Sequence, residues 1–518
     1  MSFEDPSVIT EQLLDQIDLR WAERIAKGEP YRHIILIGHS VGAVLARSVY
    51  VHACGENADA PWGAKARSRA PKSWAKSVSR LILLAAMSRG WSISHNLSRA
   101  HAFTFWVATV GWNLLQPFTR RRPLIFAFRR GAPFVTQLRI ECLSMARHAD
   151  AKGVGGAVTV QLLGTVDDLV SPRDNIDLVS GRDFVYLDAP MSGHVNIRDM
   201  DSTEAGQRRA EVFLHSLLAE PDLLKSESVP PEDLLPYPPN DKVTDVIFVI
   251  HGIRDEGYWT QRIARRVKVE GRKAGRVFEA ETSSYGYFPM LPFLLPSTRR
   301  AKVEWLMDEY TEDLALYPNA AFSFVGHSNG TYLLARALQD YPACHFQRVV
   351  FAGSVVSTRY DWSHMLERER VKAVLNYVAT SDWVVAFFPK GFQQLRLQDL
   401  GSAGHDGFRE SSQVGLSQIR FVHGNHSTAV QEANWDAIAR FVVHGEVQKP
   451  ESPLYGKTRS SWVVLGGLAP PVIWLIIVLI AAGAGLLLVW ALWGQPEWLR
   501  TVALIVYLAA LFRVLTRL

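Results

Sequence analysis

Cysteine is scarce in this chain: Cys54, Cys142 and Cys344 are the only three among 518 residues. They lie far apart, so they form neither a disulfide framework nor the close pairs of a metal-binding knuckle, and a reducing compartment suits such a content. No histidine, cysteine or carboxylate set has the spacing of a metal site, and no Gly-x-x-x-x-Gly-Lys phosphate loop occurs. We therefore expect no metal and no cofactor.

An excess of one charge is also missing. The formal net charge is +5 at pH 7, and the basic residues are spread out apart from short clusters at 120–122 and 129–130. A nucleic-acid-binding protein should carry a denser basic stripe, so we expect no nucleic-acid partner. The N-terminal sequence MSFEDPSVITEQ is polar and acidic, which is not the pattern of a signal peptide.

Long hydrophobic runs are absent until the C-terminal region. Residues 472–493 then form 22 consecutive uncharged and mostly apolar positions, enough to span a bilayer as a helix. A second run at 499–518 is apolar apart from three arginines, and it either spans with the arginines at the headgroups or lies at the interface. Because the link between the runs is short, a transmembrane helical hairpin is expected.

The charges that flank the two runs predict their orientation. Lysine and arginine are enriched on the cytoplasmic side of membrane proteins, and here they precede the first run and close the second. These residues are Lys449, Lys457, Arg459, Arg513 and Arg517. Both ends, and hence the large N-terminal portion, are expected to face the cytoplasm.

Proline-rich linkers divide the chain before this membrane region. Strand-like runs alternate with helical patterns on both sides of the first linker, as at 258–270 and 298–316. This alternation predicts an α/β fold, with two mostly parallel sheets and helices on both faces of each. The expected organisation is a first domain at 1–220, a linker at 221–242, a second domain at 243–445, a linker at 446–461 and transmembrane segments at 462–518.

One short motif occurs twice. Residues 34–42 read IILIGHSVG and residues 322–330 read FSFVGHSNG, each a strand-like run that ends in Gly-His-Ser-x-Gly before a helical pattern. A sharp turn from strand to helix needs small residues on both sides, and it projects the serine hydroxyl above the sheet edge at a helix N-terminus. Ser40 and Ser328 are therefore candidate nucleophiles. Two ordinary glycine-flanked turns are the simpler alternative, but the repeated context argues against them.

A serine hydroxyl needs a histidine to take its proton and a carboxylate to orient that histidine. In this architecture the acid and the histidine follow the serine in that order, with the acid just after a strand. In the second domain Asp382 follows a strand, with N-capping of a helix as its alternative role. Of the later histidines His405, His423 and His426, the last lies in the loop before the final helix and is the best base.

The first domain contains the same order of residues. Its strand ends at Gly164, and Asp167 and Asp168 both follow within reach; the spacing from the glycine favours Asp167. His194 precedes the closing helix and is the candidate base, with an incidental loop histidine as the alternative.

With these residues in place, both domains resemble α/β-hydrolase-fold serine hydrolases of the lipase and esterase type, over 33–218 and 243–444. The resemblance implies two catalytic triads, Ser328–Asp382–His426 and Ser40–Asp167–His194. It also implies an oxyanion hole made by the amide after the serine and by an early loop following a His-Gly pair. In the second domain these donors are Asn329 and Ile253, the latter after His251-Gly252, and in the first domain only Val41 remains.

The first domain departs from the family pattern because 33 residues before the turn cannot hold the preceding strands and the oxyanion loop. Loss of one oxyanion donor typically lowers the rate by about 10²–10³. The first domain is therefore expected to be a weakened or inactive copy, to borrow a donor elsewhere, or to lack an upstream segment through a start-site error.

Two aromatic stretches lie near these sites. The insertion at 90–150 combines aromatic side chains with arginines, and it is expected either to cap the active site, where it could meet an anionic membrane surface, or to pack as a small helical subdomain. The stretch 285–296 is a channel wall or a packed loop.

The leading hypothesis is a membrane-anchored serine hydrolase that cleaves carboxylic esters, of lipids or acylated substrates, without a cofactor. A membrane-tethered scaffold with at least one inactive hydrolase fold is the second hypothesis. A thioesterase, an amidase or an acyltransferase with the same triad stays open, and the oligomeric state is not predicted.

Overall fold

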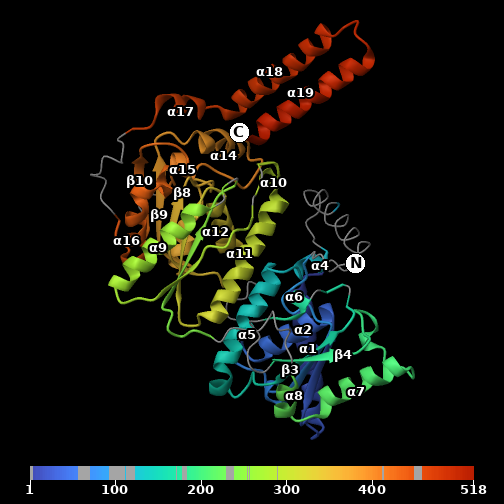
Figure 1. Cartoon of the computed structure of the whole chain (residues 1–518). Coiled ribbons are helices and arrows are strands. Elements are labelled where there is room, and N and C mark those ends of the chain that lie inside the picture. Colours follow the sequence, from blue (N-terminus) through green and yellow to red (C-terminus); the bar gives the residue numbers. More distant parts are fainter. Residues whose placement is uncertain are drawn as a thin grey trace. The chain divides into compact units, whose positions relative to one another are not determined.

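The protein forms two compact units in a computed structural model (Figure 1). Unit 1 comprises Met1–Asn240, Glu304–Pro318 and Asp340–Ala343, and unit 2 comprises Asp241–Val303, Asn319–Gln339 and Cys344–Leu518. Each unit contains one parallel sheet. The described residues are 4–56, 70–92, 111, 123–167, 169–170, 172–177, 184–228, 239–253, 255, 257–286, 288, 290–410, 414–447 and 458–517.

Unit 1 is built on four parallel strands in the order β1-β2-β3-β4. The strands are β1 (Ile34–His39), β2 (Val78–Leu84), β3 (Val158–Gly164) and β4 (Phe184–Ala189). The helices are α1 (Pro6–Ala26), α2 (Val41–Ala53), α4 (Leu124–Ala127), α5 (Pro133–Lys152), α6 (Pro172–Asn175), α7 (Glu204–Leu218) and α8 (Pro221–Glu227), with 3-10 turns η1 (Ala75–Ser77) and η4 (Asn196–Arg198).

Alternate side chains of β2 enter different cores, which shows that helices cover both faces of this sheet. Leu81 and Leu83 pack with Leu14 of α1 and Val49 of α2. Ile82 lies in a separate cluster with residues of β3, β4 and α8, against which α7 also packs. Successive side chains of a strand point to opposite faces, so a strand buried on both sides is apolar at consecutive positions, as LILL is in β2.

Unit 2 has six parallel strands in the order β10-β9-β8-β7-β5-β6. The strands are β5 (Asp245–Ile250), β6 (Phe278–Glu281), β7 (Ala321–His327), β8 (Phe346–Ala352), β9 (Val371–Ala379) and β10 (Leu416–Val422). The helices before the C-terminal segment are α9 (Tyr258–Lys273), α10 (Met290–Leu294), α11 (Pro296–Leu316), α12 (Asn329–Asp340), α13 (Trp362–Glu367), α14 (Trp383–Leu395), α15 (Ala403–Asp406) and α16 (Trp435–His444), with 3-10 turns η6 (Thr428–Val430) and η7 (Glu432–Asn434). From Glu304 onward, α11 belongs to unit 1.

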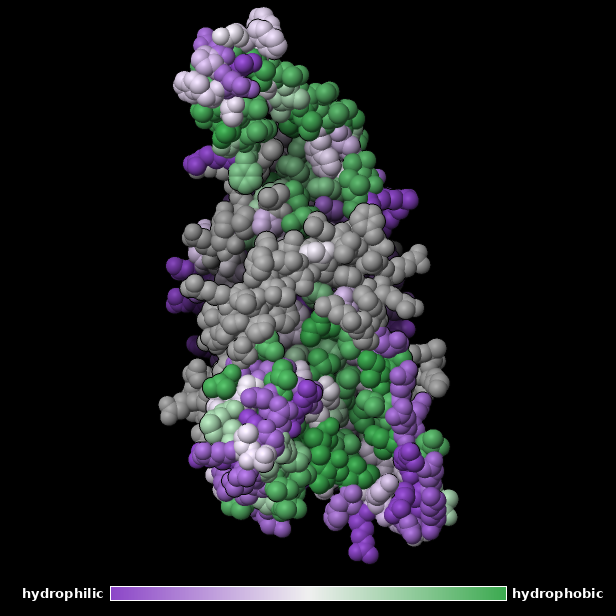
Figure 2. All heavy atoms as spheres, turned by 90° about the vertical axis from the view of Figure 1, so that its right-hand side faces the viewer, coloured by the Kyte–Doolittle hydropathy of each residue, from purple (hydrophilic) through white to green (hydrophobic). Residues whose placement is uncertain are grey.

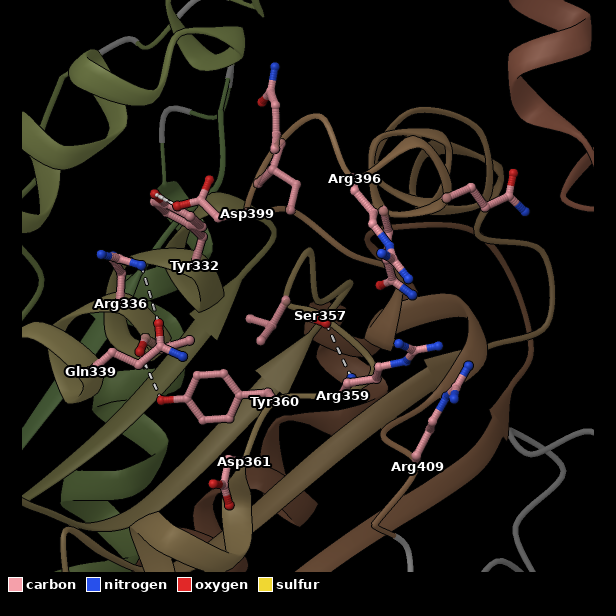
Figure 3. A pocket seen from close by; sticks show the side chains of 16 residues that line it. Tyr332, Arg336, Gln339, Ser357, Arg359, Tyr360, Asp361, Arg396, Asp399 and Arg409 are labelled. Atoms are coloured by element: carbon pink, nitrogen blue, oxygen red, sulfur yellow. Dashed lines mark hydrogen bonds between the residues drawn. The ribbon is translucent and has the colours of Figure 1, made fainter. Parts of the chain in front are cut away.

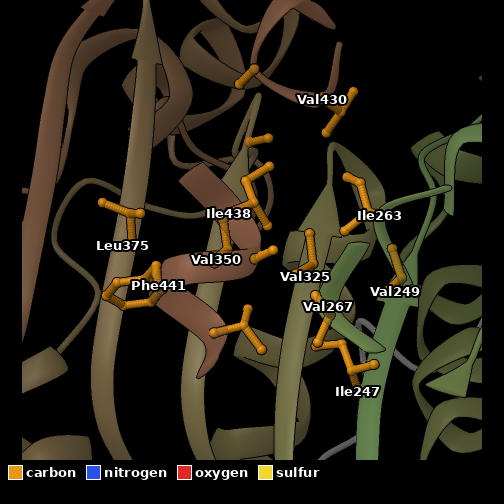
Figure 4. Close-up of a cluster of buried hydrophobic side chains, with 14 of the residues drawn as sticks. Ile247, Val249, Ile263, Val267, Val325, Val350, Leu375, Val430, Ile438 and Phe441 are labelled. Atoms are coloured by element: carbon orange, nitrogen blue, oxygen red, sulfur yellow. The ribbon is translucent and has the colours of Figure 1, made fainter. Parts of the chain in front are cut away.

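Helices α9 and α16 cover one face of this sheet together. Ile263 and Val267 of α9 and Ile438 of α16 pack against valine and isoleucine side chains of β5, β7 and β8, as Figure 4 shows. The opposite face of the sheet contains Phe248, whose ring centroid lies 5.9 Å from that of Phe346.

The two sheets differ beside the strand that precedes the serine. In unit 2, β7 pairs with β8 on one side and with β5 on the other. In unit 1, β1 pairs with β2, and within the described part of the chain no strand pairs with its other edge. Ile35 and Ile37 on that edge strand are 36% and 51% exposed. Within the described residues the serine strand is thus an edge strand in unit 1 and an inner strand in unit 2.

Three helices end the chain: α17 (Ser461–Gly466), α18 (Pro470–Ala491) and α19 (Glu497–Arg517). Helix α18 is long and apolar enough to cross a membrane, and it is unburied. Helix α19 runs beside it, and the Tyr507 hydroxyl donates a hydrogen bond to the Ala481 carbonyl. Figure 2 shows hydrophobic side chains gathered on this pair at the top of the view. The expected transmembrane hairpin stays a prediction.

The predicted fold class is therefore confirmed: both sheets are parallel and have helices on both faces, and an apolar helix follows in the C-terminal region.

Candidate active sites

The two Gly-His-Ser-x-Gly motifs form the same backbone turn. Ser40 separates β1 from α2 at a φ of 54°, and Ser328 separates β7 from α12 at a φ of 51°. A positive φ is uncommon for a residue with a β-carbon. Such strain persists only where the surrounding structure imposes it, and it is concentrated at functional sites.

The glycine before each serine is required by close packing. A β-carbon on Gly38 would lie 2.4 Å from the Cα atom of Ala43, and one on Gly326 would lie 3.1 Å from the backbone of Gly330. The contact at Gly38 leaves no room for a β-carbon, and the contact at Gly326 leaves little.

In unit 1 the three predicted side chains form a hydrogen-bonded series. The Ser40 hydroxyl lies 2.8 Å from Nε2 of His194, and Nδ1 of that ring lies 3.2 Å from Oδ2 of Asp167. Asp167 follows β3, and its other oxygen accepts the backbone N–H groups of Leu169 (2.9 Å) and Val170 (3.0 Å). These bonds fix the carboxylate, so the ring can face the hydroxyl with the geometry of a general base. Asp168 lies outside the described residues.

In unit 2 the predicted acid and base also pair. Nδ1 of His426 lies 3.1 and 3.0 Å from the two carboxylate oxygens of Asp382. Asp382 is fully buried at the end of β9, and its Oδ1 also accepts the backbone N–H of Val385, so it caps α14. Asp382 therefore caps α14 and pairs with His426 at the same time, while its role as a catalytic acid stays a prediction.

The surroundings keep Asp382 ionised. Burial alone would raise the pKa of this carboxyl group, but the charge of His426, its hydrogen bond and the N–H of Val385 outweigh burial and lower the pKa. An ionised carboxylate is what a histidine needs when it takes up a proton.

Ser328 differs from Ser40 in its contact with the base. Among the described residues no hydrogen bond joins the Ser328 hydroxyl to His426. Close packing nevertheless confines both groups: a β-carbon on Gly353 would lie 2.8 Å from the His426 ring, and one on Gly252 would lie 2.7 Å from Cβ of Ser328.

The loop after β5 lies directly against the candidate nucleophile of unit 2. Its conformation is tied to α12 by Tyr285, whose hydroxyl donates to the His251 carbonyl (2.9 Å) and accepts from the Asn329 side chain (3.2 Å). The His251 ring stacks on Tyr285 with centroids 4.6 Å apart. This network holds the backbone near Ile253 and Asn329, the two predicted oxyanion donors. The sequence predicts only a channel wall or a packed loop for the stretch that contains Tyr285, so this role of Tyr285 is new.

Among the described residues, fewer backbone groups surround the serine turn of unit 1. A β-carbon on Gly330 in unit 2 would lie 2.5 Å from the Ile250 carbonyl of β5, whereas one on Gly42 would meet no atom of the described residues within 4 Å. Within this part of the chain, no backbone takes the place of β5 beside Gly42. Val41 begins α2 and remains the predicted donor there.

The histidine inside each motif was not predicted to have a role. His39 donates from Nε2 to the His194 carbonyl (2.7 Å), and His327 approaches the His426 carbonyl in the same way (3.3 Å). Burial, followed by the charge of His426, lowers the pKa of His327 to about 3, so its ring stays neutral. These histidines position the loops that hold the candidate bases, and their presence in both motifs was the available signal.

The other candidate histidines lie elsewhere. His405 is buried in α15, where burial lowers its pKa to about 4. His423 follows β10 and is exposed. Neither forms a hydrogen bond to Asp382 among the contacts of the described residues.

The structure describes only parts of the two aromatic stretches. Within the predicted cap at 90–150, residues 93–110 and 112–122 lie outside the described residues. Two of its arginines pair with carboxylates of unit 1, Arg129 with Glu304 and Arg130 with Asp174. In 285–296 the rings of Tyr285, Phe288 and Phe293 are buried and contact one another, as in a packed loop.

No group of three or more potential metal ligands occurs in the part of the chain that the structure describes. No family model matches the chain, and no curated protein matches it. One similar solved structure is LpqC, the poly(3-hydroxybutyrate) depolymerase from Bordetella parapertussis, with 16% identity over 41% of this chain and 84% of that chain and a TM-score of 0.29. The α/β architecture rests on the two parallel sheets and not on this likeness.

Proposed function

We propose that this protein is a serine hydrolase that cleaves carboxylic esters, of lipids or other acylated substrates, and that α18 attaches it to a membrane. The observation that carries the proposal is the strained serine turn, present in both units, each with a histidine–aspartate pair on the predicted residues. Ordinary strand-to-helix turns have no reason to recur with such a pair.

In the proposed reaction Ser328 attacks the ester carbonyl and His426 takes the hydroxyl proton. Asp382 stabilises the imidazolium that forms, and the histidine then gives the proton to the departing alcohol. The amides of Asn329 and Ile253 would stabilise the oxyanion. Water releases the acyl group by the same steps in reverse, so no cofactor is required.

Ser40, His194 and Asp167 would act in the same way in unit 1, with Val41 as the oxyanion donor. The hydrogen-bonded series supports proton transfer, while a single donor predicts slower chemistry by about 10²–10³. We therefore assign the main turnover to unit 2.

The test is turnover of p-nitrophenyl esters by the full chain in detergent. Ser328→Ala should lower kcat by at least about 10²-fold, the double variant with Ser40→Ala should abolish the remainder, and Ser427→Ala, an exposed neighbour of the base, should leave kcat unchanged. Full activity in the double variant would refute the proposal.

A scaffold with inactive hydrolase folds is the second candidate. Two absences among the described residues favour it: the Ser328 hydroxyl forms no hydrogen bond to His426, and no atom lies within 4 Å of a β-carbon built on Gly42. A fluorophosphonate probe separates the two, because a scaffold would be labelled at neither Ser40 nor Ser328. Thioester, amide and acyl-transfer substrates are compared in the same assay.

We place the two units on the cytoplasmic side of the membrane, following the lysine and arginine residues that flank the apolar segments.

A further inference from the structure

A second concave site in unit 2 lies beside α12. It is a cavity of about 640 Å³ that contains Arg336 of α12, Arg359 after β8, Arg396 at the end of α14 and Arg409 before β10. Figure 3 shows the guanidinium ends of Arg359, Arg396 and Arg409 gathered on one side of it. We call this cavity the arginine pocket.

The carboxylates of the arginine pocket are already engaged by other groups. Asp399 accepts from Arg299 (2.7 Å) and from the Tyr332 hydroxyl (2.8 Å), and Asp361 caps α13 by accepting the His364 N–H (2.9 Å). Arg299 neutralises the charge of Asp399, and Asp361 lies apart from the guanidinium ends of Arg359, Arg396 and Arg409 (Figure 3).

Three arginines of the pocket form no ion pair with a carboxylate of the described residues. Within the described residues no ion pair involves Arg359, Arg396 or Arg409, and all three are exposed. Converging guanidinium groups present paired N–H donors that match phosphate oxygens. The pocket thus has the chemistry of a phosphate site.

The pocket adjoins the base of the apolar helix α18. Gln394, which lines it, donates from its side chain to the carbonyl of Leu468, just before α18 (3.2 Å). The preceding part of α14 packs against α18, where the Phe388 ring stacks on Trp474 with centroids 6.2 Å apart. Pocket and membrane helix therefore belong to one packed region.

Exposed apolar side chains surround this junction. Leu395 and Leu397 flank Arg396 and are 47% and 63% exposed, and Trp462, Leu465 and Leu468 beside α18 are 63% to 67% exposed. Large apolar side chains next to cationic ones are typical of surfaces that enter the headgroup region of an anionic bilayer.

We propose that the arginine pocket binds the phosphate of an anionic lipid in the membrane that α18 enters. The inference rests on the membrane attachment in the proposed function and not on its esterase chemistry. A soluble phosphate ester would satisfy the same guanidinium groups, but the leucines beside Arg396 favour a ligand with acyl chains.

The experiment measures ligand binding to the full chain in detergent. The probes are dioctanoyl phosphatidic acid, dioctanoyl phosphatidylcholine and glycerol 3-phosphate. The wild type should bind the anionic lipid about tenfold more tightly than the other two probes, as expected when several charge-assisted hydrogen bonds are added.

The variant Arg359→Gln, Arg396→Gln, Arg409→Gln should lose this preference. Its matched control, Arg262→Gln, Arg265→Gln, Arg272→Gln on the exposed side of α9, removes the same charge elsewhere in unit 2 and should keep it. Melting without ligand shows that both variants fold, since all six side chains are exposed.

Equal binding of both lipids by the wild type, or a preference that survives in the pocket variant, would overturn the proposal. Binding of glycerol 3-phosphate as tightly as the anionic lipid would overturn the lipid source and identify a soluble phosphate ester. Ester turnover is measured on the same detergent preparations, and carbonate extraction on the membranes from which they are made, so failure of the proposed function is distinguished from failure of this pocket.

Discussion

Gly353 leaves room for the ring of the candidate base in unit 2. Gly353 follows β8 at a φ of 54°, and the His426 ring occupies the space where its β-carbon would project. The corresponding residue of unit 1, directly after β2, is Ala85 at a φ of 43°. One position is therefore glycine in one unit and alanine in the other, which gives a matched pair of substitutions.

We expect Gly353→Ala to displace His426 and to lower kcat of unit 2 by about 10²-fold, since a misplacement of about 1 Å has that effect. The measurement is ester turnover in a Ser40→Ala background, where unit 2 acts alone. Ala85→Gly in a Ser328→Ala background is the control and should change turnover of unit 1 less than about threefold. A Gly353→Ala enzyme with unchanged kcat and melting temperature would contradict the assignment of His426.

For single residues, the order along the chain was enough to predict which candidate residues lie near each other. Asp167 and Asp382 follow strands, and the carboxyl ends of parallel strands meet at one edge of a sheet, so each was expected near its histidine. The contacts of His39 and Tyr285 were not predictable, because they depend on loop paths that no local pattern specifies. Whether the assembled residues catalyse stays a prediction.

Among the elements, α5 and α11 show how buried charges join helices within unit 1. Arg139 of α5 is fully buried, and it contacts Asp177 (3.0 Å) and Asp308 of α11 (2.6 Å). Asp308 also accepts from Arg89 (2.7 Å), and these arginines keep the pKa of its carboxyl group low against the effect of burial. Such a network is stable only while each charge has its partner.

Arg139→Met should therefore lower the free energy of unfolding of unit 1 by about 3–5 kcal/mol. The network would then have two arginines, Arg47 and Arg89, for the three carboxylates of Asp177, Asp308 and Glu312, and one buried negative charge would stay uncompensated. Urea unfolding of the full chain, followed by circular dichroism, measures the change. Arg208→Met is the control: its pair with Glu204 is exposed, so the change should stay below about 1 kcal/mol. Equal stability of the two variants would show that the network contributes nothing.

The sequence predicted helices correctly where the apolar periodicity was clear, and it missed a helix that contains a proline. The expected helices at 258–270 and 298–316 are α9 (Tyr258–Lys273) and α11 (Pro296–Leu316). Helix α14 was not predicted, because Pro389 lies inside it and proline disfavours a helix interior. Its capping residue is Asp382, for which the sequence favoured the role of a catalytic acid over that of a helix cap.

At the scale of the whole molecule the two sheets differ in what lies beside the strand that precedes the serine. Unit 2 has β5, its following loop and α9 there, whereas the described part of unit 1 begins its sheet at the serine strand. The short segment before Ser40 led to the expectation of an incomplete first domain, which stays a prediction. The sequence could not specify the contacts of the turn itself: among the described residues no atom lies within 4 Å of a β-carbon built on Gly42.

The last prediction concerns attachment through α18. Leu479 and Ile480 lie near its middle and are 60% and 66% exposed. An arginine at the centre of a membrane helix costs about 2.5–3.5 kcal/mol. The variant Leu479→Arg, Ile480→Arg should therefore move the full chain from the carbonate-resistant membrane fraction into the extractable one, while Leu479→Ala, Ile480→Ala should remain resistant. Ester turnover in each fraction shows that the variants fold, because both substituted residues lie in α18, outside the two sheets and their serine turns. Retention of the arginine variant in the membrane would mean that α18 is not the anchor and would leave α19 as the attachment.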